Sequence, residues 1–445
     1  MRSAALDARE PAAAEPVLDG RANRLGIDGV TLLTIYVVLL FAVPSRLVFA
    51  PLGGAGTPAL IVGCAGAAFW LWYHLHRSQP FPPASTRVRW SLGAFVATVL
   101  ASYAAAMYRP IVAAEVSTAD LGLILLVGWV GVALVAHDGI SDITRFETLV
   151  GRLTVAGGAV AILGILQFLT RQPLIDHVEF PGLTTNASLD SVLGRSGFAR
   201  PAGTAIHPIE FGVMLTVVLP FALHRGLYYD HLNRLRRWWP TLAIAGAIPL
   251  SISRSALVGS AVVLLVLLPT WPSARRWASL ALIGALFGVI FLTIPGMLRT
   301  LTTMFTGIGG DSSARSRTDS YGLALEFVAR NPVVGRGWST FLPAYRILDN
   351  QYLGALVEVG VLGLSALLAL ILTAFLSARR ARTLTTDPSQ RDLAQATAAG
   401  IASAAVSLAF FDGFGFPMAS GLFFLVIGMS GALGRVLGHR QAVAR

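Results

Sequence analysis

Arginine side chains in three polar segments could bind an anion together. Arg195 and Arg200 lie in the segment GRSGFARPAGTAIHPIEFG, Arg254 lies within SISRS, and Arg315 and Arg317 open a polar, helix-forming stretch. A guanidinium donates paired, charge-assisted hydrogen bonds, which suit phosphate oxygens. Arg254 is held between two apolar runs, where a charge costs about 2–3 kcal/mol at a helix centre, so we expect it to have an anionic partner. Each arginine alone is also consistent with an anchor at lipid headgroups or a solvated charge.

The side chains of His207 and Asp349 could each transfer a proton beside such an anion. His207 precedes Pro208 in the first turn of an expected helix, and Glu210 lies one turn in. The unpaired N–H groups of a helix N-terminus also suit an anion. Asp349 and Asn350 precede an apolar run that begins at Tyr352. An aspartate at this position could act as a base if it is partly desolvated, or it could only cap the helix.

Other common chemistries lack their residues in this chain. The sequence has no phosphate-binding glycine loop, no CxxC pair and no cluster of His, Asp and Glu with metal spacing, so we expect no nucleotide, cofactor or metal site. The single Cys64 excludes an intrachain disulfide. The net charge of +11 does not indicate a nucleic-acid partner, because the basic residues, all of them arginine, are scattered along the chain.

The elements that must position these residues are those of an all-α polytopic membrane protein. Of the 445 residues, 55% are hydrophobic and 13% are charged, and the mean hydropathy is +0.68. Apolar runs near the ~20 residues that a bilayer core requires recur along the whole length. We expect about 12 transmembrane helices, at residues 29–49, 56–75, 90–107, 118–136, 147–169, 205–224, 239–252, 254–269, 276–295, 351–376, 394–411 and 417–434.

The distribution of arginine predicts that both chain ends face the cytoplasm. Arginines concentrate in the segments that this orientation places inside, such as 225–237 and 379–391, and are sparse in the short outer loops. Two long loops, 170–204 and 296–350, are then extracytoplasmic. The expected organisation is a disordered cytoplasmic tail at 1–27, a transmembrane domain at 28–436 and a cytoplasmic tail at 437–445.

The longest polar interruption, residues 311–360, lies mostly in the second of these loops. An apolar stripe with helical spacing predicts an amphipathic helix over 316–330, with Tyr321, Ala324, Leu325 and Val328 on one face. Asn331-Pro332 should end this helix, and Gly335 to Gly337 should form a flexible corner. The last outer turn, FDGFGFP at 411–417, should place its aromatic rings at the membrane interface.

Three segments resemble, in the same order, the O-antigen ligase and polymerase superfamily, which also holds teichuronic acid polymerases. They are GRSGFARPAGTAIHPIEFG, then LSISRSALVG, then RSRTDSYGLALEFVARNPVVGRGWSTF ending in DNQYLGALVEVGVLGL. The third is the most specific of the three, because it joins a helix ending in Asn-Pro, a glycine corner and Asn-x-Tyr-Leu followed by Glu-x-Gly-x-x-Gly. The resemblance covers about residues 190–370 and does not separate ligase from polymerase.

The resemblance implies glycosyl transfer at the outer face of the bacterial cytoplasmic membrane. The donor would be a glycan linked to undecaprenyl pyrophosphate, the acceptor a hydroxyl of a glycan or a lipid, and no metal would be required. Arg200, Arg254, Arg315 and Arg317 would hold the pyrophosphate. Ligases of this family commonly have His-Asn where this chain has Asp349-Asn350, so the base stays open between Asp349 and His207. Further candidates for the site are Arg195, Glu210, Asn350 and Tyr352.

Two other functions fit the same composition. A transporter of lipid-linked glycans would need charged or broken-helix sites near the middle of the bilayer. A non-catalytic partner in polysaccharide export would tolerate substitution of Arg254 or Asp349. The sequence favours the enzyme, because few charges lie inside the apolar runs and the polar residues gather at one expected face.

Overall fold

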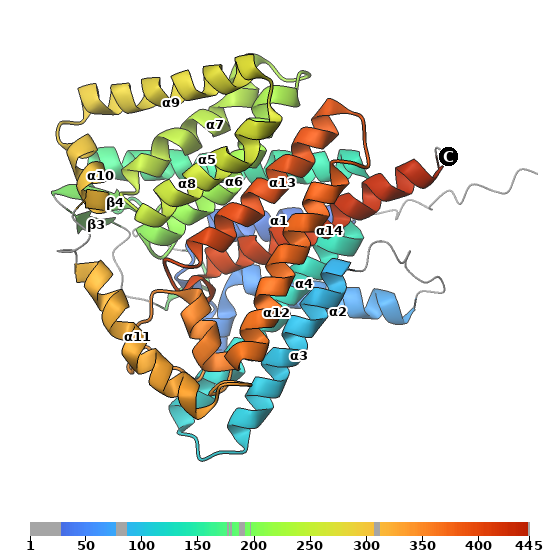
Figure 1. The fold of residues 1–445 in the computed structure, drawn as a ribbon, viewed down its shortest axis with the longest axis vertical. Coiled ribbons are helices and arrows are strands. Elements are labelled where there is room, and N and C mark those ends of the chain that lie inside the picture. The colour runs from blue at the N-terminus through green and yellow to red at the C-terminus, as the bar shows by residue number, and fades with distance from the viewer. Residues whose placement is uncertain are drawn as a thin grey trace, which may run out of the picture.

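The structure is a computed structural model that describes residues 28–76, 87–175, 178, 180–186, 192–195, 197–306 and 312–443. For residues 192, 193, 195, 312–319 and 440–443 it describes the backbone alone. The described chain is a bundle of α-helices with two short two-stranded sheets on it (Figure 1). This confirms the predicted all-α membrane class.

The long helices follow one another through the whole chain. They are α1 (Gly29–Ala42), α2 (Pro58–Leu75), α3 (Arg87–Met107), α4 (Ala113–Gly139), α5 (Ile143–Thr170), α6 (Pro208–Tyr228), α7 (Arg234–Leu250), α8 (Arg254–Leu267), α9 (Ser273–Thr293), α10 (Met297–Thr306), α11 (Ser312–Arg330), α12 (Gln351–Ala381), α13 (Pro388–Ser407) and α14 (Pro417–Val443).

Short elements occupy the connections. Three are 3-10 helices: η1 (Ala50–Gly56), η3 (Leu268–Thr270) and η5 (Gly413–Gly415). The strands are β1 (Leu47–Val48), β2 (Thr184–Thr185), β3 (Val192–Arg195) and β4 (Phe198–Pro201). β1 pairs antiparallel with β2, with Leu47 opposite Thr185, and β3 pairs antiparallel with β4, with Leu193 opposite Arg200. The β1–β2 pair joins the first outer connection to the 170–204 loop.

Each of the twelve predicted spans corresponds to a helix. Eight of the described helices are long and apolar enough to cross a membrane: α2, α3, α4, α5, α6, α9, α12 and α14. Two shorter apolar helices are Gly29–Ala42 and Arg254–Thr270. The remaining two, α7 and α13, complete the set, and their crossing of the membrane stays a prediction.

Polar caps fix where several helices begin. The carboxylate of Asp28 accepts a hydrogen bond of 2.8 Å from the Thr31 N–H, and Asp142 accepts one of 3.0 Å from the Arg145 N–H. Asn233 and Asp387 cap α7 and α13 in the same way. A side-chain oxygen at this position satisfies an N–H that has no partner within its own helix. These short polar residues therefore interrupt the apolar runs at defined points.

The centre of the bundle is formed by α6, α13 and α14. Most of α6 and α14 is buried by protein, and α13 packs on α6, α8 and α12 (Figure 1). By contrast, α9 lies along one edge of the bundle and buries little of its surface. Its Trp277 and Leu292 expose 72% and 79% of their surface. Apolar side chains exposed on a helix of this length are those that a lipid bilayer would cover.

The helix ends meet at two opposite faces of the bundle. At one end, Asp28 pairs with Arg145, and Asp392 accepts hydrogen bonds from Trp271 and contacts His224. At the other end, the Ser45 N–H donates to the Thr204 carbonyl, and Arg200 donates to the Ser251 carbonyl. We call these the inner and the outer face, after the predicted orientation. Loops expected on one side of the membrane thus contact one another.

The polar segment 311–360 folds as a helix followed by a packed loop. α11 ends at Arg330, before Asn331-Pro332, as predicted. Its buried face differs from the predicted stripe, because Tyr321 and Leu325 are exposed while Ala324 is fully buried. Phe327 and Val328 complete this contact with α12. The interface is therefore rotated toward positions 324, 327 and 328.

The glycine corner is not flexible, because it packs against a break in α12. Gly360 has φ +66° and ψ −169°, which interrupts the helix. The Arg336 N–H donates to the Val357 carbonyl, and the Gly337 N–H donates to the Glu358 carbonyl, both at 2.9 Å. A Cβ on Gly335 would lie 2.3 Å from the Glu358 backbone. The glycines are thus required by close backbone approach.

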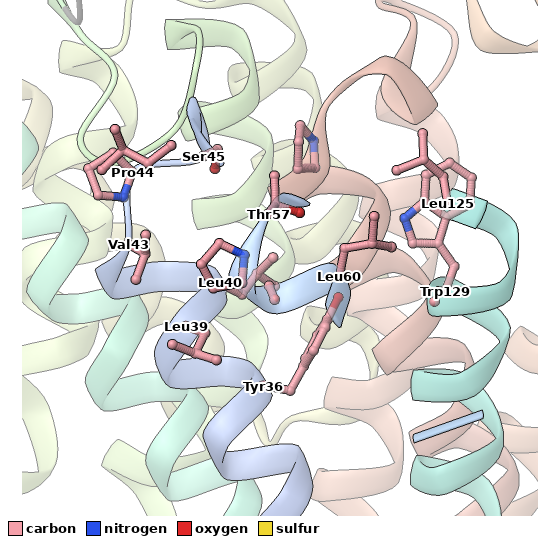
Figure 2. Close-up of a pocket in the computed structure, with 15 residues that line it drawn as sticks. Tyr36, Leu39, Leu40, Val43, Pro44, Ser45, Thr57, Leu60, Leu125 and Trp129 are labelled. Carbon is pink, nitrogen blue, oxygen red and sulfur yellow. The ribbon is translucent and has the colours of Figure 1, made fainter. Parts of the chain in front are cut away.

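A small apolar cavity of about 30 Å³ lies between α1, α2 and α4 (Figure 2). Tyr36, Leu40, Leu60 and Trp129 are among its walls. This volume is about that of one or two water molecules, and few polar groups point into it. We interpret it as a packing gap, and the site must lie elsewhere.

Candidate functional site

A cavity of about 360 Å³ with both charged and apolar walls opens among the helix ends at the outer face. Four predicted site residues line it: Arg200, His207, Arg254 and Asp349. The remaining walls are Ile209, Ser253, Ser255, Ile347, Phe410, Phe411 and Phe416. We call this the arginine cavity. Residues from four separate parts of the sequence meet there, and two arginines face one carboxylate and one imidazole.

The N-terminus of α8 lies at this cavity without a side-chain cap. Ser253 occupies the N-cap position but makes no capping hydrogen bond, and its hydroxyl instead lies 2.8 Å from that of Ser255. Arg254 is the first residue of α8, and its Nη1 reaches the Met304 carbonyl at 3.5 Å. A helix N-terminus carries a partial positive charge and N–H donors. With Arg254 beside it, this end of α8 is suited to an anion.

The other helices that begin near the cavity are capped by the protein. The Glu210 carboxylate accepts hydrogen bonds from the N–H groups of Met418 at 2.7 Å and of Ile206 at 2.8 Å. His207 Nδ1 accepts one from the Ile209 N–H at 3.1 Å. These bonds occupy the N-termini of α6 and α14. The contrast with α8 indicates where a ligand, rather than a side chain, would supply the acceptor.

Glu210, Asn350 and Tyr352 hold the scaffold of the site. Glu210 is fully buried, and its bonds join α6 to α14. Asn350 caps α12 by accepting from the N–H groups of Tyr352 and Leu353. The Tyr352 hydroxyl donates to the Ala405 carbonyl at 2.6 Å and so ties α12 to α13. Among the described residues, none of the three lines the arginine cavity.

Two residues at the cavity have a left-handed backbone. Ile252 has φ +46° and Asp349 has φ +49°. This conformation is unfavourable for residues with a Cβ, and most of all for a β-branched one. Such conformations cost about 1–3 kcal/mol and persist where the surroundings impose them. Ile252 turns the chain directly before Ser253, and Asp349 turns it directly before Asn350, the cap of α12.

Asp412, which the sequence reasoning passed over, lies near Asp349. It belongs to the turn between α13 and α14, where protein atoms surround it although its own side chain remains accessible to solvent. Enclosure by the protein, together with the negative charge of Asp349, raises the pKa of Asp412 to about 6. The only signal in the sequence is one carboxylate in a short apolar turn.

The aromatic residues of this turn are not an interface belt. Phe411 exposes 1% of its surface and Phe414 exposes 8%, so both are packed inside the bundle. Phe414 contacts Trp129 and Phe424, and its N–H donates to the Gln351 side chain. The prediction was wrong because the turn folds back over the helices. Phe416 lines the arginine cavity, where its ring lies 6.2 Å from that of His207.

His207 remains neutral in this setting. Burial, together with the positive charge of Arg200, lowers the pKa of His207 to about 4. Because Nδ1 accepts the Ile209 N–H, the proton of the neutral ring is assigned to Nε2. The imidazole thus offers a hydrogen-bond donor rather than a free basic nitrogen.

Three predicted arginines fall outside the described side chains. The backbone of Arg195 belongs to β3, opposite Phe198, and the backbones of Arg315 and Arg317 belong to the first turns of α11. Their side chains lie outside the described residues. Their roles stay predictions.

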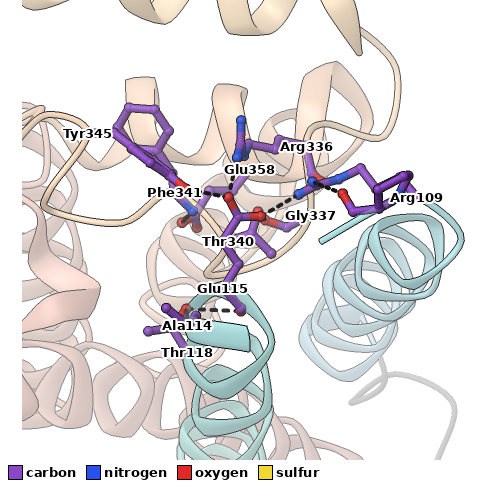
Figure 3. Close-up of polar contacts among 11 residues, drawn as sticks. Arg109, Ala114, Glu115, Thr118, Arg336, Gly337, Thr340, Phe341, Tyr345 and Glu358 are labelled. Carbon is purple, nitrogen blue, oxygen red and sulfur yellow. Dashed lines mark hydrogen bonds and ion pairs between the residues drawn. The ribbon is translucent and has the colours of Figure 1, made fainter. Parts of the chain in front are cut away.

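A buried carboxylate anchors the loop that follows α11 (Figure 3). Glu115, at the start of α4, is 2% exposed and accepts from Arg109 Nη2 at 3.0 Å and from the Tyr345 hydroxyl at 2.5 Å. Arg336 also pairs with Glu115, and Arg109 Nε donates to the Arg336 carbonyl. We call these four residues the Glu115 cluster. Arg336 and Tyr345 lie more than 200 residues from Glu115 in sequence, so no local pattern could have revealed these two contacts.

No group of three or more His, Cys, Asp or Glu in the described part of the chain is arranged to hold a metal ion. The nearest pair at the site is Asp349 with Asp412. The charged and polar groups that line the arginine cavity are two guanidinium groups, one imidazole, one carboxylate and two serine hydroxyls.

The fold and site define a multi-pass membrane protein with an arginine-rich cavity at one end of its helix bundle. Residues 239–368 of the chain match the family described as O-antigen ligase. This match confirms the resemblance of that segment to the O-antigen ligase and polymerase superfamily. The matched segment holds α8, α11 and most of α12, whereas Arg200 and His207 lie outside it. No curated protein matches the chain.

Proposed function

We propose that the protein transfers a glycan from undecaprenyl pyrophosphate to an acceptor hydroxyl at the arginine cavity. The observation that carries the proposal is the uncapped N-terminus of α8, which lies with Arg254 and Arg200 on the same cavity as Asp349. An anion site and a carboxylate side by side are what displacement of a pyrophosphate by a hydroxyl requires. The family match supports a lipid-linked glycan as the class of substrate.

The donor pyrophosphate would lie at the start of α8. Arg254 and Arg200 would donate charge-assisted hydrogen bonds to its oxygens, with Ser253 and Ser255 completing the contacts. As the bond between sugar C1 and the phosphate oxygen breaks, its electron pair moves onto the pyrophosphate. Fixed positive charges at the cavity stabilise that developing charge. Arg315 and Arg317 of α11 are proposed to approach the same group from the loop.

Asp349 is proposed as the base. Its carboxylate takes the proton of the acceptor hydroxyl while the hydroxyl oxygen forms the new bond to C1. The products are the extended glycan or glycolipid and free undecaprenyl pyrophosphate. Asp412 would favour this step, because its negative charge nearby attracts the proton that leaves the acceptor hydroxyl. His207 would donate a hydrogen bond from Nε2 to the donor.

The acceptor decides between ligase and polymerase, and either is compatible with this site. We propose that the cavity faces the extracytoplasmic side of the bacterial inner membrane. This placement follows from the arginine distribution, which assigns the opposite end of the bundle to the cytoplasm.

Substitution of Arg254 tests the proposal. Arg254→Ala should lower transfer by about 100-fold or more, because two charge-assisted hydrogen bonds to the leaving group would be lost. Arg254→Lys should restore only part of the rate, since lysine lacks the planar fork. The assay is transfer from a purified undecaprenyl-pyrophosphate glycan to its acceptor in detergent or nanodiscs, with melting behaviour measured in parallel.

Arg330→Ala is the matched control. Arg330 is exposed at the end of α11 and does not line the arginine cavity, so its loss should leave the rate unchanged. Full activity of Arg254→Lys would exclude a bidentate contact with pyrophosphate. Full activity of Arg254→Ala would favour a transporter or a non-catalytic export partner instead.

A further inference from the structure

A second, larger cavity runs along the lateral surface of the bundle between α1 and α5. Its volume is about 660 Å³, and its walls are mainly apolar, with Val38 and Val155 exposed by 51% and 40%. The lining includes Ile175 and Thr204 toward the outer face. Along α5 it runs from Thr148 at the inner face to Leu163. At 1.5 Å per residue this is a length of about 22 Å. We call this cavity the lateral groove.

Two arginines lie at the inner end of the lateral groove. Arg152 is exposed and donates to the Thr34 hydroxyl at 2.5 Å. Arg225 is 8% exposed, and its terminal nitrogens donate only to the carbonyls of Gly151 at 3.1 Å and Arg236 at 3.2 Å. Its Nε is buried without a hydrogen-bond partner in the described residues.

The charges of these two arginines are not neutralised by the described protein. Neither forms an ion pair with a carboxylate of a described residue. A buried guanidinium bonded only to neutral carbonyls keeps its full charge, and burial of an uncompensated charge is costly. Nearby, Arg145 and Arg237 each have an aspartate. The pair at the groove is therefore arranged for an anion that the described residues do not provide.

The position of the pair excludes the glycan donor in its reacting state. The donor's pyrophosphate would bind at the outer face, in the arginine cavity, whereas Arg152 and Arg225 lie at the inner face. The apolar walls of the lateral groove favour an anion that carries an apolar chain. Basic pockets between membrane helices at the cytoplasmic level are suited to the headgroups of anionic lipids.

We propose that the lateral groove binds an anionic phospholipid of the inner leaflet. Its phosphate lies between Arg152 and Arg225, and one acyl chain follows the apolar surface of α1 and α5. The lipid fills the space between two helices and neutralises a buried charge, so it acts as a structural part of the bundle. The choice of a phospholipid over the glycan donor rests on the proposed function, which places the donor's pyrophosphate in the arginine cavity.

Native mass spectrometry of the full-length protein tests the proposal. The protein is released from nanodiscs that contain equal amounts of phosphatidylglycerol and phosphatidylcholine. The wild-type protein should retain one phosphatidylglycerol in preference to phosphatidylcholine. Arg152→Gln should lower its affinity about tenfold, because one charge-assisted contact with phosphate is lost. This variant changes an exposed side chain and should leave the fold intact.

Three further variants complete the test. Ala159→Phe should also lower phosphatidylglycerol binding, because it fills the groove while keeping both arginines. Arg87→Gln, which removes an exposed inner-face arginine outside the groove, should bind like the wild type, and so should Arg254→Ala. Unchanged binding in both Arg152→Gln and Ala159→Phe would overturn the proposal. Displacement of phosphatidylglycerol by undecaprenyl phosphate at equal concentration would overturn it too, because the groove would then belong to the isoprenoid carrier.

Discussion

Asp349 lines the arginine cavity and Asp412 lies near Asp349, so the same functional group occurs there in two different settings. Asp349 lies on a left-handed turn directly before the cap of α12, with Asn350 taking over the capping bonds. Asn350, and not Asp349, therefore has the capping role that the sequence alone could not assign. Asp412 is enclosed by the turn before α14 and influences Asp349 through its charge. The two carboxylates should consequently differ in what their loss does to transfer.

Asp349→Asn should lower kcat about 100-fold or more with little change in KM for the donor. The amide keeps the shape of the side chain but cannot accept a proton, and a general base typically contributes at least that factor. Steady-state kinetics with purified donor and acceptor measure it. Asp387→Asn is the control, because Asp387 caps α13 at the inner face and an asparagine can still cap. An unchanged kcat for Asp349→Asn would rule out this base.

The rate of transfer should depend on pH through Asp412. Since its pKa is raised to about 6, Asp412 is neutral below that pH and negative above it. Its charge supports proton uptake by Asp349, so the wild-type rate should fall as pH decreases through about 6. Asp412→Asn should be slower at pH 7.5 and should lose the inflection near 6. A pH profile in which the inflection persists in Asp412→Asn would assign it to another group.

At the scale of elements, the site depends on the break in α12 and on the loop that packs against it. The corner at Gly335 fits against the Glu358 backbone, and the Glu115 cluster ties the same loop to α4. Together they fix the path of the chain from α11 to Asp349. A loop with two such anchors acts as a wall of the cavity rather than as a mobile lid.

Glu115→Gln should loosen this loop. The amide leaves Arg109 and Arg336 without their shared negative charge, which should cost about 2 kcal/mol locally for partly buried partners. We expect faster limited proteolysis between residues 331 and 347 and a lower melting temperature. Glu326→Gln, on the exposed side of α11, should change neither. Equal cleavage rates for both variants would show that the cluster does not hold the loop.

At the scale of the whole molecule, the two faces can be tested by labelling. In a Cys64→Ala background, Ala344→Cys lies exposed at the outer face and Thr386→Cys lies exposed at the inner face. A membrane-impermeant maleimide should label the first in intact spheroplasts and the second only after lysis. The reverse pattern would invert the orientation and move the arginine cavity to the cytoplasm.

The sequence allowed much of the bundle to be predicted, because apolar runs and short polar caps are local signals. It also brought Arg200, His207, Arg254 and Asp349 into one proposed site. It could not identify Asp412, whose role arises only when the turn before α14 folds over the cavity. The prediction of a flexible glycine corner was also wrong. Glycine is required both in a flexible hinge and where the backbone closely approaches another segment, here Glu358, so the residue type alone does not distinguish the two.

The packing of α8 limits how the family segment could be used on its own. Residues 239–368 contain α8, yet its buried side packs on α6 and α13, both outside that segment. Gly259 of α8 meets Thr216 of α6 and Ser403 of α13 at distances that admit no Cβ. A truncated protein made of the segment alone would expose this close-fitting surface and lose half of the arginine cavity. Grafts between relatives should therefore exchange α6, α8 and α13 as one set.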